Sequence, residues 1–136
     1  MNRPSQEGAL AGLKVLDLSR VLAGPWCTQI LADLGADVVK IERPGVGDDT
    51  RTWGPPFLMD SHGKATDQAT YFTSCNRNTR AVTIDMATPE GQALLKQMAA
   101  QSDIVVENFK TGGLEQYGLD HKSLRAVNPR LIYCSI

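Results

Sequence analysis

The sequence is poor in cysteine and histidine, and this scarcity excludes several kinds of site. Its three cysteines, Cys27, Cys75 and Cys134, show no C-x-x-C spacing, so we expect free thiols in a reducing, cytoplasmic compartment. His62 and His121 stand far apart along the chain. They offer no metal-ligand spacing, so we expect no metal site.

Excess charge and long apolar runs are also missing. The formal net charge is −1 over 136 residues, so we expect neither nucleic acid nor a membrane as a partner. No apolar stretch approaches the roughly 18 residues that cross a bilayer. The polar start, MNRPSQEGALAG, lacks the apolar region of a secretory signal. With 42% hydrophobic residues, the chain is long enough for one packed core.

Short apolar runs alternate with helical patterns along the chain. The apolar runs predict strands at residues 13–18, 37–42, 81–85, 103–107 and 131–136. Caps, stops and apolar spacing predict helices at about residues 25–34, 69–75, 89–101, 113–117 and 121–127. This alternation predicts an α/β fold, namely a Rossmann-like, open, mostly parallel sheet with flanking helices.

The first predicted helix carries apolar residues near helical spacing. Trp26, Ile30, Leu31 and Leu34 recur in this way before the stop at Gly35. Such a repeat is typical of the stripe that an amphipathic helix turns toward the core.

The second predicted strand is followed by a loop of unusual composition. The run IERPGVGDDTRTWGPPF, from Ile41 to Phe57, combines glycines and prolines with adjacent aspartates, two arginines and a tryptophan. Glycine and proline disfavour both helix and strand. The run is therefore either a plain surface connection or a ligand loop, because long loops in compact domains are often functional.

Polar and aromatic residues follow the carboxyl ends of the predicted strands. Ser19 to Ala23 follow the first strand, Arg43 the second, and Asn108 to Lys110 the fourth. Such sheets bind ligands at that edge, and cations beside an aromatic ring and a helix N-terminus suit a phosphorylated, ring-bearing ligand. The turn LAGPW is not a G-x-G-x-x-G fingerprint, so an NAD-dependent oxidoreductase is disfavoured.

These residues also have plainer interpretations. Arg43 and Arg51 could form surface ion pairs with Asp48 and Asp49. Phe109 could be an ordinary core residue. Asp17, near the end of the first strand, could be catalytic, but a hydrogen-bonded structural aspartate is the commoner outcome.

Several runs, taken in order, resemble one family. They are LKVLDLSRVLAGPWCTQILADLGADVVKIERPGVGDDTR, YFTSCNRNTRAVTIDM, TPEGQALLKQM, DIVVENFKTGGLEQYGL and NPRLIYCSI. Together they resemble the family III CoA-transferases, the group of formyl-CoA transferase. The run GDDTRTWGPPF is most similar to members that use succinyl-CoA and a dicarboxylic acid such as glutarate, which favours a ligand loop.

The resemblance implies a set of contacts with coenzyme A or an acyl-CoA, which would be a substrate. The implied contact residues are Leu22, Ala23, Arg43, Ile84, Asp85, Met86, Ala87, Asn108, Phe109 and Lys110. Two positions depart from the pattern of some relatives, which have a lysine at the position of Ala87 and an arginine at that of Gln116. Phosphate contacts at these two positions are therefore not implied.

The resemblance also implies a mechanism and an organisation. CoA would move between an acyl-CoA and a free carboxylic acid through an anhydride on an aspartate, which we expect to lie beyond Ile136. We expect residues 1–11 to form a tail and 12–136 the N-terminal, CoA-binding part of the large domain of an interlocked homodimer. The alternatives are an alpha-methylacyl-CoA racemase-like enzyme and a non-catalytic CoA- or nucleotide-binding module.

Overall fold

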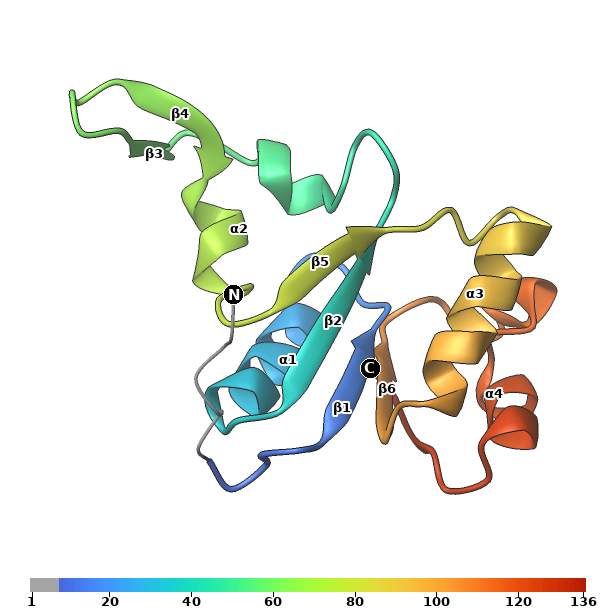
Figure 1. Cartoon of the computed structure of the whole chain (residues 1–136). Coiled ribbons are helices and arrows are strands. Elements are labelled where there is room, and N and C mark those ends of the chain that lie inside the picture. The colour runs from blue at the N-terminus through green and yellow to red at the C-terminus, as the bar shows by residue number, and fades with distance from the viewer. Residues whose placement is uncertain (1–7) are drawn as a thin grey trace.

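The structure is a computed structural model that describes residues 8–136, and its centre is a parallel sheet (Figure 1). Five strands lie in the order β5-β2-β1-β6-β7, and each neighbouring pair is parallel. They are β1 (Lys14–Asp17), β2 (Asp37–Glu42), β5 (Arg80–Thr83), β6 (Ile104–Glu107) and β7 (Ile132–Ser135). The predicted α/β sheet is confirmed, and all five carboxyl ends meet at one edge.

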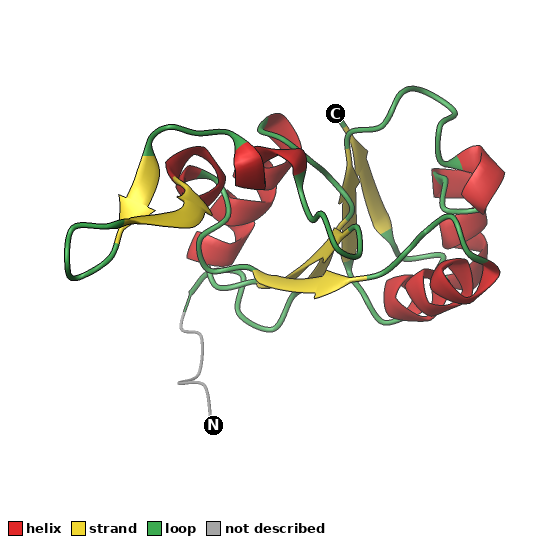
Figure 2. Cartoon of the chain, turned by 90° about the horizontal axis from the view of Figure 1, so that it is seen from above, coloured by secondary structure: helices red, strands yellow, loops and turns green. Residues whose placement is uncertain are grey.

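Helices cover both faces of the sheet (Figure 2). On one face lies α1 (Ala23–Asp33), and on the other lie α3 (Pro89–Ala100) and α4 (His121–Val127). Alternate residues of β1 supply the two cores, since Val15 packs with the α1 side and Leu16 with the α3 and α4 side. The strand–helix–strand order seen in the sequence thus produces a three-layer arrangement.

Most of the apolar stripe predicted for α1 is not buried, although one of its four residues, Leu31, packs against the core on the α1 side. Trp26, Ile30 and Leu34 are 54%, 48% and 45% exposed. The buried residues of α1 are instead Gly24, Pro25, Thr28, Gln29 and Ala32. Small residues let the helix approach the sheet closely, and the buried polar ones are bonded: the Thr28 hydroxyl donates to Asp17 at 2.7 Å and the Gln29 amide to the Ser74 carbonyl at 3.2 Å. Sequence periodicity alone could not separate the two faces.

The glycine- and proline-rich loop leads into structure that the sequence did not predict. It contains a 3₁₀ turn, η1 (Asp49–Thr52), and is followed by an antiparallel hairpin of β3 (Phe57–Met59) and β4 (Ala65–Ala69). The hairpin stands apart from the main sheet (Figure 1). The predicted short helix follows it as α2 (Thr70–Ser74), and η2 (Glu115–Tyr117) is the predicted turn before α4.

The described part of the predicted N-terminal tail is packed against α1. The Leu10 N–H donates to the Leu34 carbonyl at 2.9 Å, and Leu10 contacts the core on the α1 side. Residues 1–7 of that tail lie outside the described residues. Within residues 8–136, no helix has the length and apolar character needed to cross a membrane.

Candidate functional site

A pocket of about 270 Å³ lies at the carboxyl edge of the sheet. Its walls come from the ends of β1 and β2, the turn before α3, the segment after β6, and Tyr117 of η2. The fold thus brings half of the implied contact residues to one place. These are Arg43, Asp85, Met86, Ala87 and Phe109.

The other implied residues lie beside this pocket or away from it. Leu22 precedes α1 and is partly exposed, and Ala23 begins that helix. Ile84 packs against the core on the α3 and α4 side. Lys110 lines a different pocket, whereas Asn108 is engaged by the backbone of a neighbouring segment.

Asn108 fastens the segment after β6 to the segment after β1. Its side-chain oxygen accepts the Arg20 N–H at 2.9 Å, and its amide nitrogen donates to the Arg20 carbonyl at 2.7 Å. Both ends of the side-chain amide are therefore occupied by one residue. In this structure Asn108 fixes the backbone of Arg20 and so sets where the Arg20 side chain begins.

The Arg20 side chain lies over the ring of Phe109. The guanidinium carbon is 4.8 Å from the ring centroid, which is a cation–π contact. Both residues line the pocket. Phe109 also packs against the core on the α3 and α4 side, so it is at once a partly buried core residue and part of the pocket wall.

Asp48 fastens the glycine- and proline-rich loop to the turn after β1. Its carboxylate accepts the Val21 N–H at 3.2 Å and the Thr50 N–H at 3.0 Å. It also pairs with the Lys40 ammonium at 3.0 Å, and both side chains are almost completely buried. Lys40 further donates to the Ser19 carbonyl at 2.9 Å. One carboxylate thus organises the loop and the adjacent turn.

The turn that Asp48 holds has an unusual backbone. Val21 has φ of +71°, a value that β-branched residues rarely adopt. Such a conformation persists where surrounding contacts impose it. Here the imposing contacts are the Asp48 carboxylate on the Val21 N–H and the Asn108 amide on the preceding residue.

A second ion pair closes the loop from the other side. Arg51 donates to both carboxylate oxygens of Glu42, at 2.6 and 2.7 Å, and its guanidinium carbon lies 3.9 Å from the ring centroid of Phe72. Arg43 pairs with Asp49 at the surface. The simple pairing considered for Arg43 is therefore present, whereas Arg51 has a buried partner that the sequence did not single out.

These contacts keep the two loop carboxylates ionised. Burial acts to raise the pKa of Asp48, but the Thr50 N–H and the Lys40 charge outweigh it and hold that pKa below its ordinary value. Burial likewise opposes ionisation of Glu42, and the hydrogen bonds from Arg51 and the Asp48 N–H lower its pKa overall. The loop is thus held by charged groups.

Asp17 has a structural position rather than a catalytic one. It is fully buried. Its carboxylate accepts the Ser19 N–H at 2.8 Å and the Thr28 hydroxyl at 2.7 Å. Burial raises the pKa of Asp17 above its ordinary value. The walls of the pocket do not include this residue, in agreement with the structural interpretation.

The turn before α3 forms a compact wall of the pocket. Asp85 accepts the Ala87 N–H at 2.9 Å on its side chain, and its backbone carbonyl accepts the Thr88 hydroxyl at 2.9 Å. The Thr88 oxygen in turn caps α3 by accepting the Gly91 N–H at 3.1 Å. A Cβ at Gly91 would lie 1.9 Å from the Asp85 carbonyl oxygen, so only glycine permits this close approach.

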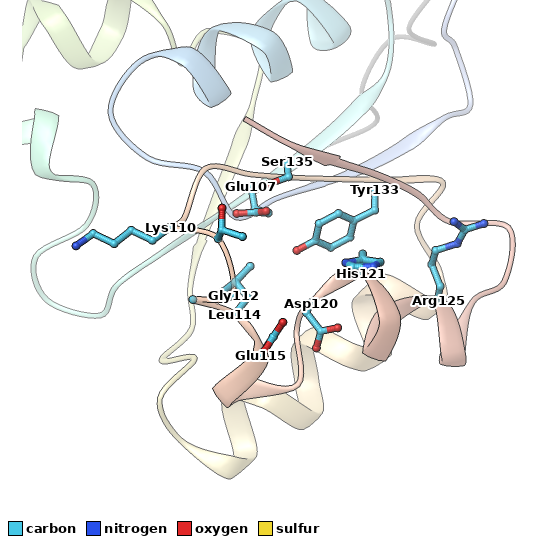
Figure 3. A pocket seen from close by; sticks show the side chains of 12 residues that line it. Glu107, Lys110, Gly112, Leu114, Glu115, Asp120, His121, Arg125, Tyr133 and Ser135 are labelled. Atoms are coloured by element: carbon cyan, nitrogen blue, oxygen red, sulfur yellow. The ribbon is translucent and has the colours of Figure 1, made fainter.

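A second hollow, of about 360 Å³, lies beside the ends of β6 and β7 (Figure 3). Lys110, Glu107, His121 and Tyr133 are among its lining residues. The Tyr133 hydroxyl donates to the Leu119 carbonyl at 3.2 Å, and burial, followed by the nearby charge of Glu107, raises the pKa of this phenol. Positive and negative side chains are mixed here, so the hollow has no clear preference for one charge.

Seven of the twelve residues that line the pocket were not among those that the resemblance implied, and Arg20 and Tyr117 are two of them. Arg20 has an obvious position after β1 in the sequence, yet only the structure shows that its side chain turns onto Phe109. Tyr117 comes from η2, a short turn far along the chain from the other walls. Within residues 8–136, no three potential metal-ligating side chains gather into a metal site.

Comparisons with known proteins agree on one family. The family model described as CoA-transferase family III matches residues 10–136. A succinate–glutarate CoA-transferase of Agrobacterium fabrum is 52% identical over 133 residues, which are 98% of this chain and 33% of the relative. A human succinyl-CoA:glutarate CoA-transferase is 47% identical over 127 residues, 93% of this chain and 27% of the relative.

A solved structure supports the same relationship. A CAIB/BAIF family protein from Brucella suis superposes with a TM-score of 0.87 at 56% sequence identity, covering 96% of this chain and 33% of that one. The chain therefore spans about a third of the length of these relatives.

Proposed function

The chain belongs to the family III CoA-transferases, and on this basis we propose that it forms the CoA-binding part of an enzyme that transfers CoA between carboxylic acids. The observation that carries the proposal is the pocket at the carboxyl edge of the sheet. It gathers Arg43, the Asp85–Ala87 turn and Phe109, all of which the family resemblance implies as CoA contacts. Ligands of open α/β sheets bind at this edge.

The chemistry of the pocket suits the nucleotide end of CoA. Phe109, Tyr117 and Met86 offer aromatic and apolar surface to an adenine ring, and Arg20 and Arg43 offer cations to phosphate groups. The turn after β1, including Leu22 and Ala23, lies beside the pocket and would contact the pantetheine arm. The ties formed by Asp48 and Asn108 hold this turn before CoA arrives, which lowers the entropy lost on binding.

We propose succinyl-CoA as the acyl donor and a dicarboxylic acid as the acceptor. Support comes from the names of relatives, which include succinyl-CoA:glutarate and succinyl-CoA:mesaconate CoA-transferases. The loop GDDTRTWGPPF also resembles that of such members. The η1 turn and the buried Asp48 hold this loop in a defined conformation, as expected for a loop that binds a ligand.

The proposed chemistry uses a carboxylate that this chain does not supply. An aspartate outside residues 1–136 attacks the thioester, forming an acyl anhydride and releasing the CoA thiolate, which then converts the anhydride to an aspartyl thioester and frees the first acid. The carboxylate of the second acid then attacks this thioester, which forms a new anhydride and releases the CoA thiolate again. The thiolate attacks the acyl carbon of the second acid, giving the new acyl-CoA and regenerating the aspartate carboxylate. The residues described here hold CoA throughout. We further propose that the full-length protein forms an interlocked homodimer. We place it in the cytoplasm, where cysteines such as the three free ones here stay reduced.

The test is an exchange assay on the full-length protein. Succinyl-CoA and glutarate are mixed with the enzyme, and glutaryl-CoA is followed by mass spectrometry. Formation of glutaryl-CoA with release of succinate supports the proposal. A racemase-like enzyme would instead exchange the α-hydrogen of a 2-methylacyl-CoA in deuterated water without moving CoA. Absence of both reactions, together with CoA binding, would leave a non-catalytic binding protein.

A further inference from the structure

The pocket contains an arginine that pairs with no carboxylate in the described chain. Arg20 lines the pocket, and its guanidinium stacks on Phe109. Within residues 8–136 it forms no ion pair, and no acceptor takes a hydrogen bond from its side chain. An arginine that presents its planar donor group to a pocket is suited to bind a phosphate or carboxylate in two-point fashion.

The neighbouring carboxylates do not satisfy it, because most have other partners. Glu42 is paired with Arg51 and Asp48 with Lys40. One side-chain oxygen of Asp85 accepts a hydrogen bond from the Ala87 N–H. The second arginine of the pocket, Arg43, is paired with Asp49. Of the two arginines that line the pocket, Arg20 is thus the one without an ion-pair partner within residues 8–136.

The position of Arg20 is also fixed in advance. Asn108 forms hydrogen bonds with both the N–H and the carbonyl of Arg20, and the guanidinium stacks on the Phe109 ring. Because Asn108 and Phe109 are neighbours in the sequence, the segment after β6 holds both the backbone and the head group of the same arginine. A preorganised side chain loses less freedom when its ligand binds.

We propose that Arg20 is an anion-binding residue of this site and contacts a phosphate of CoA. The inference rests on the proposed function, since it assigns a role within the same pocket. CoA carries phosphate in two places, as the diphosphate bridge and as the 3′-phosphate of the ribose. Both present the same oxygen chemistry to a guanidinium, so experiment must distinguish them.

The test measures affinity for CoA and for 3′-dephospho-CoA by isothermal titration calorimetry on the full-length protein. The variants are Arg20→Gln, which removes the charge, and Arg20→Lys, which keeps the charge but loses the planar fork. Arg130→Gln is the matched control, because Arg130 is exposed and lies outside the pocket. Thermal unfolding of each variant shows whether it is folded.

We expect Arg20→Gln to weaken CoA binding about tenfold or more, the size of one charged hydrogen-bonded contact. Arg20→Lys should fall between wild type and Arg20→Gln, and Arg130→Gln should match wild type. If Arg20 binds the 3′-phosphate, Arg20→Gln weakens CoA but not 3′-dephospho-CoA. If it binds the diphosphate, both ligands weaken equally.

Two outcomes would overturn the inference, and they differ in what else they affect. If wild type binds CoA and a folded Arg20→Gln binds it equally well, the role of Arg20 is wrong while the proposed function stands. If wild type binds neither CoA nor 3′-dephospho-CoA, the proposed function itself fails. In the first case, a titration with glutarate in which Arg20→Gln binds more weakly than wild type would reassign Arg20 to the acid substrate.

Discussion

Replacing Asp48 by asparagine should be among the most costly single changes in the loop. The substitution removes the negative charge that faces the buried Lys40 ammonium at 3.0 Å. The asparagine amide also has only one acceptor oxygen, whereas both carboxylate oxygens of Asp48 now serve the Val21 N–H, the Thr50 N–H and Lys40. Lys40 then keeps the Ser19 carbonyl as its hydrogen-bond acceptor and the more distant charge of Asp17.

The expected loss follows from the burial of the pair. Removing one partner of a buried ion pair costs about 3–5 kcal/mol of unfolding free energy, because an uncompensated charge stays in the interior. Lys40→Met should cost less than Asp48→Asn, since Asp48 keeps its donors on Val21 and Thr50. The double variant should lose less than the sum of the two single losses.

The assay is chemical denaturation of the wild type, both single variants and the double variant, analysed by linear extrapolation. Asp49→Asn is the matched control, because Asp49 is the next residue and its pair with Arg43 has side chains 43% and 49% exposed. That change should cost at most about 1 kcal/mol. A loss for Asp48→Asn as small as that of the control, or simple additivity in the double variant, would refute the reasoning.

Two further changes test other parts of the site, and the pH dependence of stability tests Asp48 again. Gly91→Ala should lower the free energy of unfolding by about 1–3 kcal/mol, because its new Cβ would lie 1.9 Å from the Asp85 carbonyl oxygen. Thermal unfolding measures this loss, and a CoA titration should show weaker binding by the variant. Asn108→Ala should cost about 1–3 kcal/mol by leaving the Arg20 N–H and carbonyl unpaired, measured by urea denaturation, and an unchanged midpoint would contradict the clamp. The pKa of Asp48 is lowered in the folded state, so ionised Asp48 contributes its full stabilisation at pH values above its unfolded pKa of about 3.9, and this contribution is lost as the pH falls through the folded pKa. Asp48→Asn should therefore make the free energy of unfolding less dependent on pH in the acid range. Equal pH dependence of wild type and variant would contradict this expectation.

The main sheet was predictable because the sequence has a short apolar run at each of its strands. LKVLDL, DVVKIE and DIVVE bury both faces, which is the pattern of central parallel strands. The helix caps at Thr88 and Asp120 were also readable, because each side chain accepts the N–H groups that the structure shows. These features depend on local chemistry alone.

The features that sequence reasoning missed depend on contacts between distant segments. Trp26 and Ile30 look like core residues, but α1 packs through smaller neighbours. The β3–β4 hairpin has no regular alternation, and its pairing contains an irregularity. Lys40 reads as a surface lysine within a strand, and its burial depends on Asp48, which comes from a loop that sequence alone could not fold.

The position of the site was predictable at the level of the sheet edge, but its internal roles were not. Arg43, the Asp85–Ala87 turn and Phe109 line one pocket at that edge. The contacts of these residues with CoA stay predictions, as do those of Leu22 and Lys110. Asn108 is used here to hold the backbone of Arg20, a role that no spacing in the sequence could reveal.

The exposed outer face of α1 determines what the intrinsic fluorescence of this chain reports. The two tryptophans of the sequence, Trp26 and Trp53, are 54% and 47% exposed, and neither belongs to the buried core clusters. About half of each indole is therefore exposed to water in the described chain, so melting of the core shifts their emission less than it would shift that of a fully buried tryptophan. A shift of the emission to shorter wavelength would instead signal that another protein segment has covered α1 or the loop, which makes the pair a spectroscopic gauge of assembly rather than of folding.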